Sequence, residues 1–116
     1  KFHFDKRGEF KMNEPQTVFE PIFVFKNDKL YCRFLIDYIV AGHQIQNYPL
    51  SKLQETALQS LEEISKNKNN VLSYDLKAND MTFFDNHRIL HGRTKFEDYD
   101  DENRKRYFLR TWIKFE

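Results

Sequence analysis

The sequence has 116 residues, of which 40% are apolar and 32% charged, and its formal net charge is +1. These values predict a soluble globular chain, either one domain or part of one, and exclude an intrinsically disordered protein. The near-neutral charge argues against nucleic acid as a partner, and no apolar run approaches the roughly 18 residues of a membrane span. The single cysteine, Cys32, excludes an internal disulfide. Because the chain also lacks a signal-peptide pattern, we predict a cytoplasmic location.

The first half of the chain predicts loops and one β-hairpin. Residues 1–20 are mixed and polar and are interpreted as loop with some strand. Two β-rich runs, residues 22–25 and 30–36, flank Asn27-Asp28, which is good turn chemistry, so they predict a hairpin. Residues 38–49 are predicted to be irregular.

Ser51 begins the clearest predicted helix. Ser51 and Gln54 form a capping box, in which each side chain can bond a free backbone N–H of the other residue. Apolar residues then recur at helical spacing on one face, and the helix is predicted to end within residues 66–70, where cations suit the C-terminal dipole. The apolar positions of this face are Leu53, Ala57, Leu58, Leu61 and Ile64.

The last third predicts several short strands around an acidic loop at residues 94–103. The predicted strands are residues 71–76, 81–84, 88–91 and 106–115. In the last of these, alternation places Arg106, Phe108, Arg110 and Trp112 on one face. The fold class is therefore predicted to be mainly β with one outer helix, as a sandwich or jelly roll.

Three side chains of this region could bind a metal and an organic acid. His91 can offer a neutral imidazole to a metal, although a lone histidine is more often structural or exposed. Arg106 and Arg110 lie four residues apart and can bind planar carboxylates through paired hydrogen bonds. Two interpretations of the arginine face stay open on pattern alone: a solvated surface, or a barrel interior whose guanidinium groups require anions.

Residues 79–112 resemble the C-terminal signature of the taurine dioxygenase family of iron(II)- and 2-oxoglutarate-dependent oxygenases. The resemblance covers the last third of the chain densely and is looser upstream. The matching stretches are Asn79-Asp80-Met81, Phe83-Phe84-Asp85-Asn86, Arg88-Ile89-Leu90-His91-Gly92-Arg93, Phe96-Glu97-Asp98-Tyr99 and Arg104-Lys105-Arg106-Tyr107-Phe108-Leu109-Arg110-Thr111-Trp112.

The resemblance implies a double-stranded β-helix, or jelly roll, with Fe(II) as cofactor and 2-oxoglutarate as cosubstrate. His91 would be the distal histidine of the iron triad, and Arg106 would bind the distal carboxylate of 2-oxoglutarate. Arg110 would meet an acidic group of the substrate or the other end of the cosubstrate. The implied reaction is hydroxylation of a small acidic or amino-acid-like molecule, which would be the protein's partner.

One departure from the family pattern concerns the first histidine and carboxylate, which the family supplies as His-x-Asp or His-x-Glu. The match here is His3-Phe4-Asp5, 88 positions before His91 (91 minus 3), which is closer than the family spacing. We therefore expect residues 1–116 to be the C-terminal portion of one oxygenase domain whose N-terminal part is absent. The alternatives are a catalytically silent jelly roll that binds a small carboxylate or a protein, and an interaction module with exposed Arg106 and Arg110.

Other candidates have plainer expected roles. His43 and His87 are predicted to be solvent or loop residues, and Cys32 a small core residue. Asp85 and Asn86 could either orient the region around His91 or simply form a turn.

Overall fold

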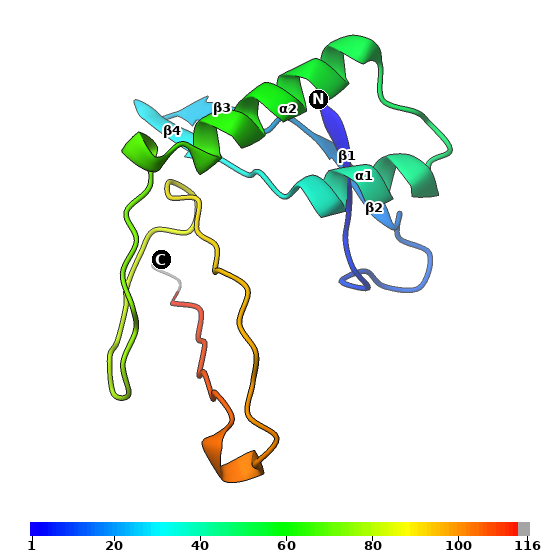
Figure 1. Ribbon diagram of the computed structural model, residues 1–116. Helices are drawn as coiled ribbons and strands as arrows, with labels where there is room; N and C mark the ends of the chain where they lie inside the picture. The colour runs from blue at the N-terminus through cyan, green and yellow to red at the C-terminus, as the bar shows by residue number, and fades with distance from the viewer. Residues whose placement is uncertain (114–116) are drawn as a thin grey trace.

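The computed structural model describes residues 1–113, which form short strands and two α-helices followed by a long irregular segment (Figure 1). Within residues 1–113, none of the helices combines the length and the apolar character that a membrane-spanning segment needs. The strands are β1 (Phe2–Asp5), β2 (Thr17–Glu20), β3 (Phe23–Lys26) and β4 (Lys29–Cys32). The helices are α1 (Ile36–Ile45), α2 (Lys52–Lys66) and the short 3-10 turns η1 (Lys68–Asn70) and η2 (Glu102–Arg104).

The strands form two antiparallel pairs, β1 with β2 and β3 with β4. The second pair confirms the predicted hairpin, because Lys26 pairs with Lys29 across Asn27-Asp28. Both turn residues have positive φ, 51° and 58°, as a two-residue hairpin turn requires. The second strand was predicted to continue to residue 36, but it ends at Cys32, before the segment that leads into α1.

Helix α2 follows its prediction, whereas α1 contradicts the irregular structure predicted for residues 38–49. Ser51 accepts a hydrogen bond from the Gln54 backbone N–H, and the Gln54 side chain accepts one from the Ser51 N–H, so the capping box is present. Helix α1 buries Ile39, Gly42 and His43, which have helical spacing. Two of these three buried residues are a glycine and a histidine, so the sequence lacks the regular spacing of apolar residues that usually predicts a helix.

The core is small and lies where β1, the start of β3 and both helices meet. Its buried apolar residues are Phe4, Ile22, Ile39 and Leu58. Helix α1 packs closely on β1 at Gly42, where an added Cβ would lie 2.4 Å from the His3 carbonyl oxygen. A side chain at this position would separate the helix from the strand, so glycine permits the packing that buries Phe4 and Ile39.

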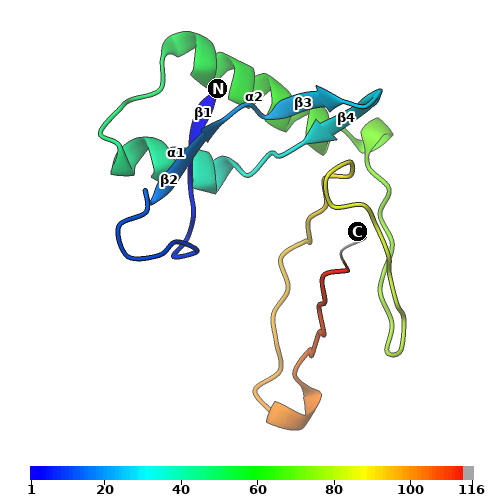
Figure 2. The same ribbon diagram turned by 180° about the vertical axis from the view of Figure 1, so that it is seen from behind.

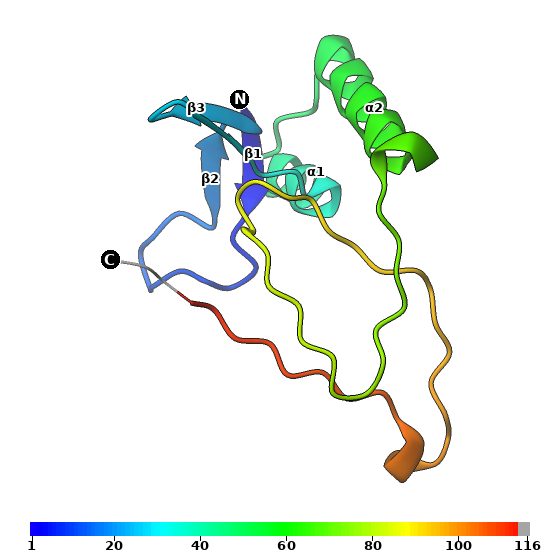
Figure 3. The ribbon, with the colours of Figure 1, turned by 90° about the vertical axis from the view of Figure 1, so that its left-hand side faces the viewer.

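The strands predicted after residue 70 are wrong for the described part of the chain. Residues 71–113 contain no regular strand, and none of them is buried. Figures 2 and 3 show this segment extending away from the helices, with η2 at its far turn. Extended backbone becomes a β-strand only when its N–H and C=O groups pair with a neighbouring strand, and the described residues provide no such partner here. The end of the predicted strand 106–115 lies outside the described residues.

The predicted fold class is therefore correct only in outline. Residues 1–113 contain a mixture of β-strands and α-helices, with two α-helices in place of the single outer helix predicted. The helices hold more residues than the strands, so these residues are not mainly β.

Candidate functional site

A turn at residues 85–89 connects the candidate site to the folded half of the molecule. The Cys32 N–H donates to the His87 carbonyl oxygen over 2.8 Å, which ties this turn to the end of β4. The Asp85 side chain accepts from the His87 N–H over 3.0 Å, and its carbonyl accepts from Arg88 and Ile89. Asp85 thus has the turn role that was one of its two predicted roles, and His87 is an exposed turn residue as predicted.

His91 follows this turn directly and is exposed to solvent. Its ring lies 4.4 Å from that of Phe84, centroid to centroid, at an angle of 47°. The next residue is Gly92, and a Cβ added there would have no heavy atom within 4 Å. The turn at 85–89 therefore limits where the backbone of His91 can lie, while its imidazole remains accessible.

Arg106 is held by an arrangement of aromatic rings and a backbone hydrogen bond. Its N–H donates to the Asp98 carboxylate over 2.9 Å. Its guanidinium carbon lies 4.2 Å from the centroid of the Phe108 ring and 5.3 Å from that of Phe96. The guanidinium carbon of Arg93 lies 4.3 Å from the same Phe96 ring. Two cations therefore share one aromatic side chain.

Arg110 has a similar but simpler environment, with its guanidinium carbon 5.3 Å from the Trp112 ring centroid. Within residues 1–113, no carboxylate forms an ion pair with Arg93, Arg106 or Arg110. Among the described residues each guanidinium contacts an aromatic ring and has no ion-pair partner, which is a composition suited to binding an anion.

Of the two interpretations left open for the arginine face, residues 1–113 show the solvated surface and not the barrel interior. The side chains of His91, Arg106 and Arg110 are all exposed, and the arginines lie on irregular backbone instead of one strand face. Exposed arginines are what the interaction-module alternative predicted. The same exposure also leaves the guanidinium groups accessible to a small carboxylate.

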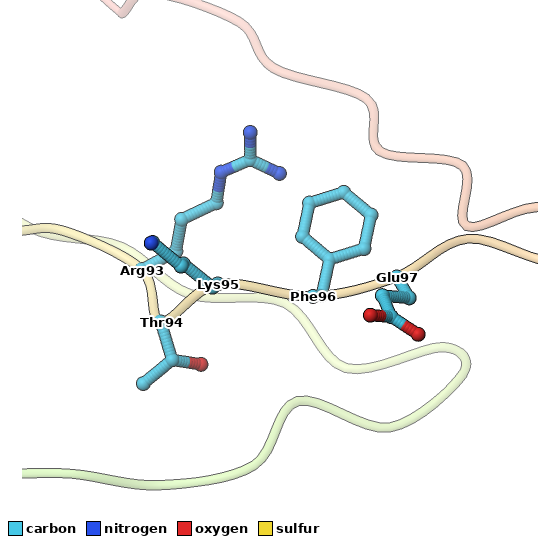
Figure 4. A pocket seen from close by; sticks show the side chains of 5 residues that line it. All are labelled: Arg93, Thr94, Lys95, Phe96 and Glu97. Carbon is cyan, nitrogen blue, oxygen red and sulfur yellow. The ribbon is translucent and has the colours of Figure 1, made fainter.

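An open cavity of about 730 Å³ lies beside this arginine-rich region. Its lining is the stretch Arg93–Glu97, which contains an arginine, a lysine and one aromatic ring. Figure 4 shows the side chains of Arg93 and Phe96 extending to the same side of the backbone, with Thr94 on the opposite side. The cavity therefore has cationic groups, an apolar surface and the carboxylate of Glu97 next to one another.

The described residues do not form a complete metal site. No three side chains of His, Cys, Asp or Glu in residues 1–113 come together as metal ligands would. In the His3-Phe4-Asp5 triplet, the Asp5 carboxylate already has a partner. It accepts a hydrogen bond from the backbone N–H of Arg7 over 2.8 Å and forms an ion pair with the Arg7 side chain at 3.2 Å. His91 is thus a possible single ligand, and an iron centre does not fit these residues by themselves.

His43 was predicted to be a solvent or loop residue, and this prediction is wrong, because His43 lies buried in α1 against His3 of β1. Both of its ring nitrogens are paired: Nδ1–H donates to the Tyr48 carbonyl oxygen over 2.8 Å and Nε2 accepts from the His3 N–H over 3.2 Å. The rings of His3 and His43 are 5.2 Å apart. Burial, and secondly the nearby His43, lower the pKa of His3. This histidine cluster, His3 and His43, is part of the packing of α1 on β1.

Cys32 is half-buried at the end of β4 and not in the core cluster, so its predicted core role holds only in part. Burial raises the pKa of its thiol. Neither feature gives it a place in the candidate site.

The sequence reasoning missed the roles of Arg93, Phe96 and Asp98. Arg93 and Phe96 are three residues apart, and Asp98 precedes Arg106 by eight. The Arg-x-x-Phe spacing was the available signal, but such pairs are common and only the coordinates show both arginines on one ring.

Comparison with known proteins identifies similar sequences. The family model described as taurine catabolism dioxygenase TauD, TfdA family matches residues 12–112. The FR-33289 synthase of Streptomyces rubellomurinus is 32% identical to this chain in an alignment that covers 97% of the chain and 34% of that protein. The chain therefore spans about a third of the length of this curated relative.

Proposed function

Because the chain belongs to the taurine catabolism dioxygenase TauD, TfdA family, we propose that it is the C-terminal part of an Fe(II)/2-oxoglutarate-dependent dioxygenase. The observation that carries this proposal is the extent of the family match, which includes His91, Arg106 and Arg110. The proposed fold of the whole domain is a jelly roll, in which residues 71–113 would pair with strands outside these 116 residues. The proposed substrate is a small acidic or amino-acid-like molecule.

His91 is proposed as one ligand of the iron. Its exposed imidazole and its position after a hydrogen-bonded turn suit a ligand that must be accessible and held in place. Its two companion ligands would come from elsewhere in the longer protein, since the described residues offer no complete set. Iron and cosubstrate would together supply the oxidising power.

Arg106 is proposed to bind a carboxylate of 2-oxoglutarate. A guanidinium offers paired N–H donors to both oxygens of a carboxylate, and that of Arg106 has no ion-pair partner within the described residues. Arg110 would bind an acidic group of the substrate or the second end of the cosubstrate. The guanidinium carbon of Arg106 lies 4.2 Å from the Phe108 ring centroid and that of Arg110 lies 5.3 Å from the Trp112 ring centroid, and such cation–π contacts would help to hold each guanidinium in place.

The test is succinate formation by the intact protein supplied with Fe(II), 2-oxoglutarate and candidate acidic substrates. Arg106→Met should raise the KM for 2-oxoglutarate by roughly ten- to a hundredfold, since a charged hydrogen-bonded pair contributes about 1.5–3 kcal/mol. Arg88→Met is the matched control, because Arg88 is exposed in the same segment without an aromatic or acidic partner among the described residues. Equal effects of the two substitutions would remove Arg106 from cosubstrate binding.

A second candidate function is a catalytically silent domain that binds a small carboxylate. It is favoured by the exposure of the guanidinium groups and by the incomplete metal site of the described residues. Calorimetric titration of 2-oxoglutarate with and without Fe(II) separates the two functions. Affinity that does not change with iron, together with no succinate, would support the silent domain.

A further inference from the structure

We propose that Phe96 is a positioning residue for Arg106, and that it sets the affinity for a dicarboxylate cosubstrate through its shared contact with Arg93. This inference rests on the proposed function, because it takes Arg106 as the residue that meets the cosubstrate. Phe96 itself would make no bond to the cosubstrate. It would act by restricting where the guanidinium group can lie.

The evidence is the set of contacts around one ring. The guanidinium carbons of Arg93 and Arg106 lie 4.3 Å and 5.3 Å from the centroid of Phe96. Phe96 is 42% exposed, so neither burial in a core nor an apolar neighbour in the core cluster explains its position. Its recorded partners within the described residues are cations, which is the contact expected of a ring that orients guanidinium groups.

The backbone contacts of the segment support the same role. The Asp98 carboxylate accepts from the N–H of Arg106 over 2.9 Å and from that of Tyr99 over 3.2 Å. This bond joins the stretch that carries Phe96 to the stretch that carries Arg106, across the turn η2. The main chain of Arg106 is thus held by Asp98 and its guanidinium by Phe96 and Phe108.

The charges indicate what kind of ligand would fit. Arg93 and Arg106 place two positive groups against one ring, and within residues 1–113 no carboxylate pairs with either. Like charges held close together repel, and a ligand with two negative charges would relieve that repulsion. A dicarboxylate such as 2-oxoglutarate has this charge, whereas a neutral molecule would not offset the repulsion between the two cations.

The experiment compares Phe96→Leu with Phe96→Tyr in the intact protein, using Phe83→Leu as the matched control. Phe83 is 76% exposed, lies in the same irregular segment and has no cation contact among the described residues. Calorimetric titration with 2-oxoglutarate, with Fe(II) present and oxygen excluded, gives affinity independently of turnover. Steady-state assays then separate the KM for 2-oxoglutarate from kcat.

The expected result for Phe96→Leu is an affinity for 2-oxoglutarate weakened by roughly two- to fivefold, the size of one exposed cation–π contact. The KM should rise by the same factor with kcat unchanged, and Phe96→Tyr should restore both because it keeps the ring. Phe83→Leu should resemble the natural protein. An affinity in Phe96→Leu equal to that of Phe83→Leu would overturn the proposal.

The experiments distinguish an error in the role of Phe96 from an error in the role of Arg106. If Arg106→Met weakens 2-oxoglutarate binding while Phe96→Leu does not, the positioning role alone is wrong. If Arg106→Met also leaves the affinity unchanged, the proposed function of this arginine is wrong. A fall in kcat without a change in affinity for Phe96→Leu would likewise contradict the positioning role.

Discussion

The close contact between α1 and β1 predicts that Gly42→Ala destabilises the protein. An added Cβ would lie 2.4 Å from the carbonyl oxygen of His3 and 2.8 Å from the backbone nitrogen of Asp5. Both neighbours are backbone atoms, so they cannot turn aside as a flexible side chain could. Reaching an ordinary contact of 3.4 Å requires helix and strand to separate by about 1 Å, the difference between 3.4 and 2.4.

Two opposing effects determine the magnitude. Alanine is favoured over glycine in a helix interior by about 1 kcal/mol, because it loses less backbone entropy on folding. Against this, overpacking costs typically about 1–3 kcal/mol and occasionally more, and here it disturbs Phe4 and Ile39, which are both fully buried. The hydrogen bond from His3 N–H to His43 would also lengthen. Weakening that hydrogen bond would add up to about 0.5–1.5 kcal/mol, so we expect a net loss of roughly 0.5–3.5 kcal/mol in the free energy of unfolding.

The assay is urea unfolding of the intact protein followed by circular dichroism, with Gly92→Ala as the control. Gly92 has no heavy atom within 4 Å of an added Cβ, and its φ is not in the left-handed region. Its substitution by alanine should leave the free energy of unfolding unchanged or raise it slightly, because alanine lowers the conformational entropy of the unfolded chain. A Gly42→Ala protein as stable as the natural one, or equal losses at both glycines, would refute the packing of α1 on β1.

Further predictions concern the helix cap, the histidine cluster and the metal. Ser51→Ala should lower the free energy of unfolding by about 0.5–2 kcal/mol through loss of the capping box, whereas Ser60→Ala, in an exposed interior position of the same helix, should not. Because the folded-state pKa of His3 is lowered from 6.5, the unfolded chain binds a proton there more readily, so the contribution of His3 to stability should be constant above that pH and fall as pH drops below it. His3→Gln should flatten this dependence in melting experiments between about pH 7 and 5. Removing iron with a chelator should abolish succinate formation, and adding Fe(II) should restore it; activity that persists without iron would contradict the proposed function.

Local signals in the sequence predicted the elements that depend on neighbouring residues. The hairpin follows from Asn27-Asp28, whose backbone supplies positive φ, and α2 follows from the cap at Ser51. Helix α1 was missed because its buried stripe includes Gly42 and His43, whose contacts come from β1 and not from the helix itself.

The candidate site could be predicted as residue types but not as an arrangement. His91 and the two arginines were identified from their residue types and spacing, and their roles from a resemblance, while the contacts of Phe96 with both guanidinium groups required coordinates. The alternation of residues 106–113 predicts which side chains would share a face if this segment paired with another strand. Pairing depends on a neighbouring strand, which no local pattern supplies and the described residues do not contain.

The most direct test of the central claim is the iron content of His91→Ala and His87→Ala proteins after equilibrium dialysis against Fe(II) without oxygen. Both histidines are exposed and lie four residues apart, so they differ little in what their loss does to folding. We expect the intact protein and His87→Ala to bind one iron with similar affinity, and His91→Ala to lose that binding. Unchanged iron binding by His91→Ala would contradict this expectation.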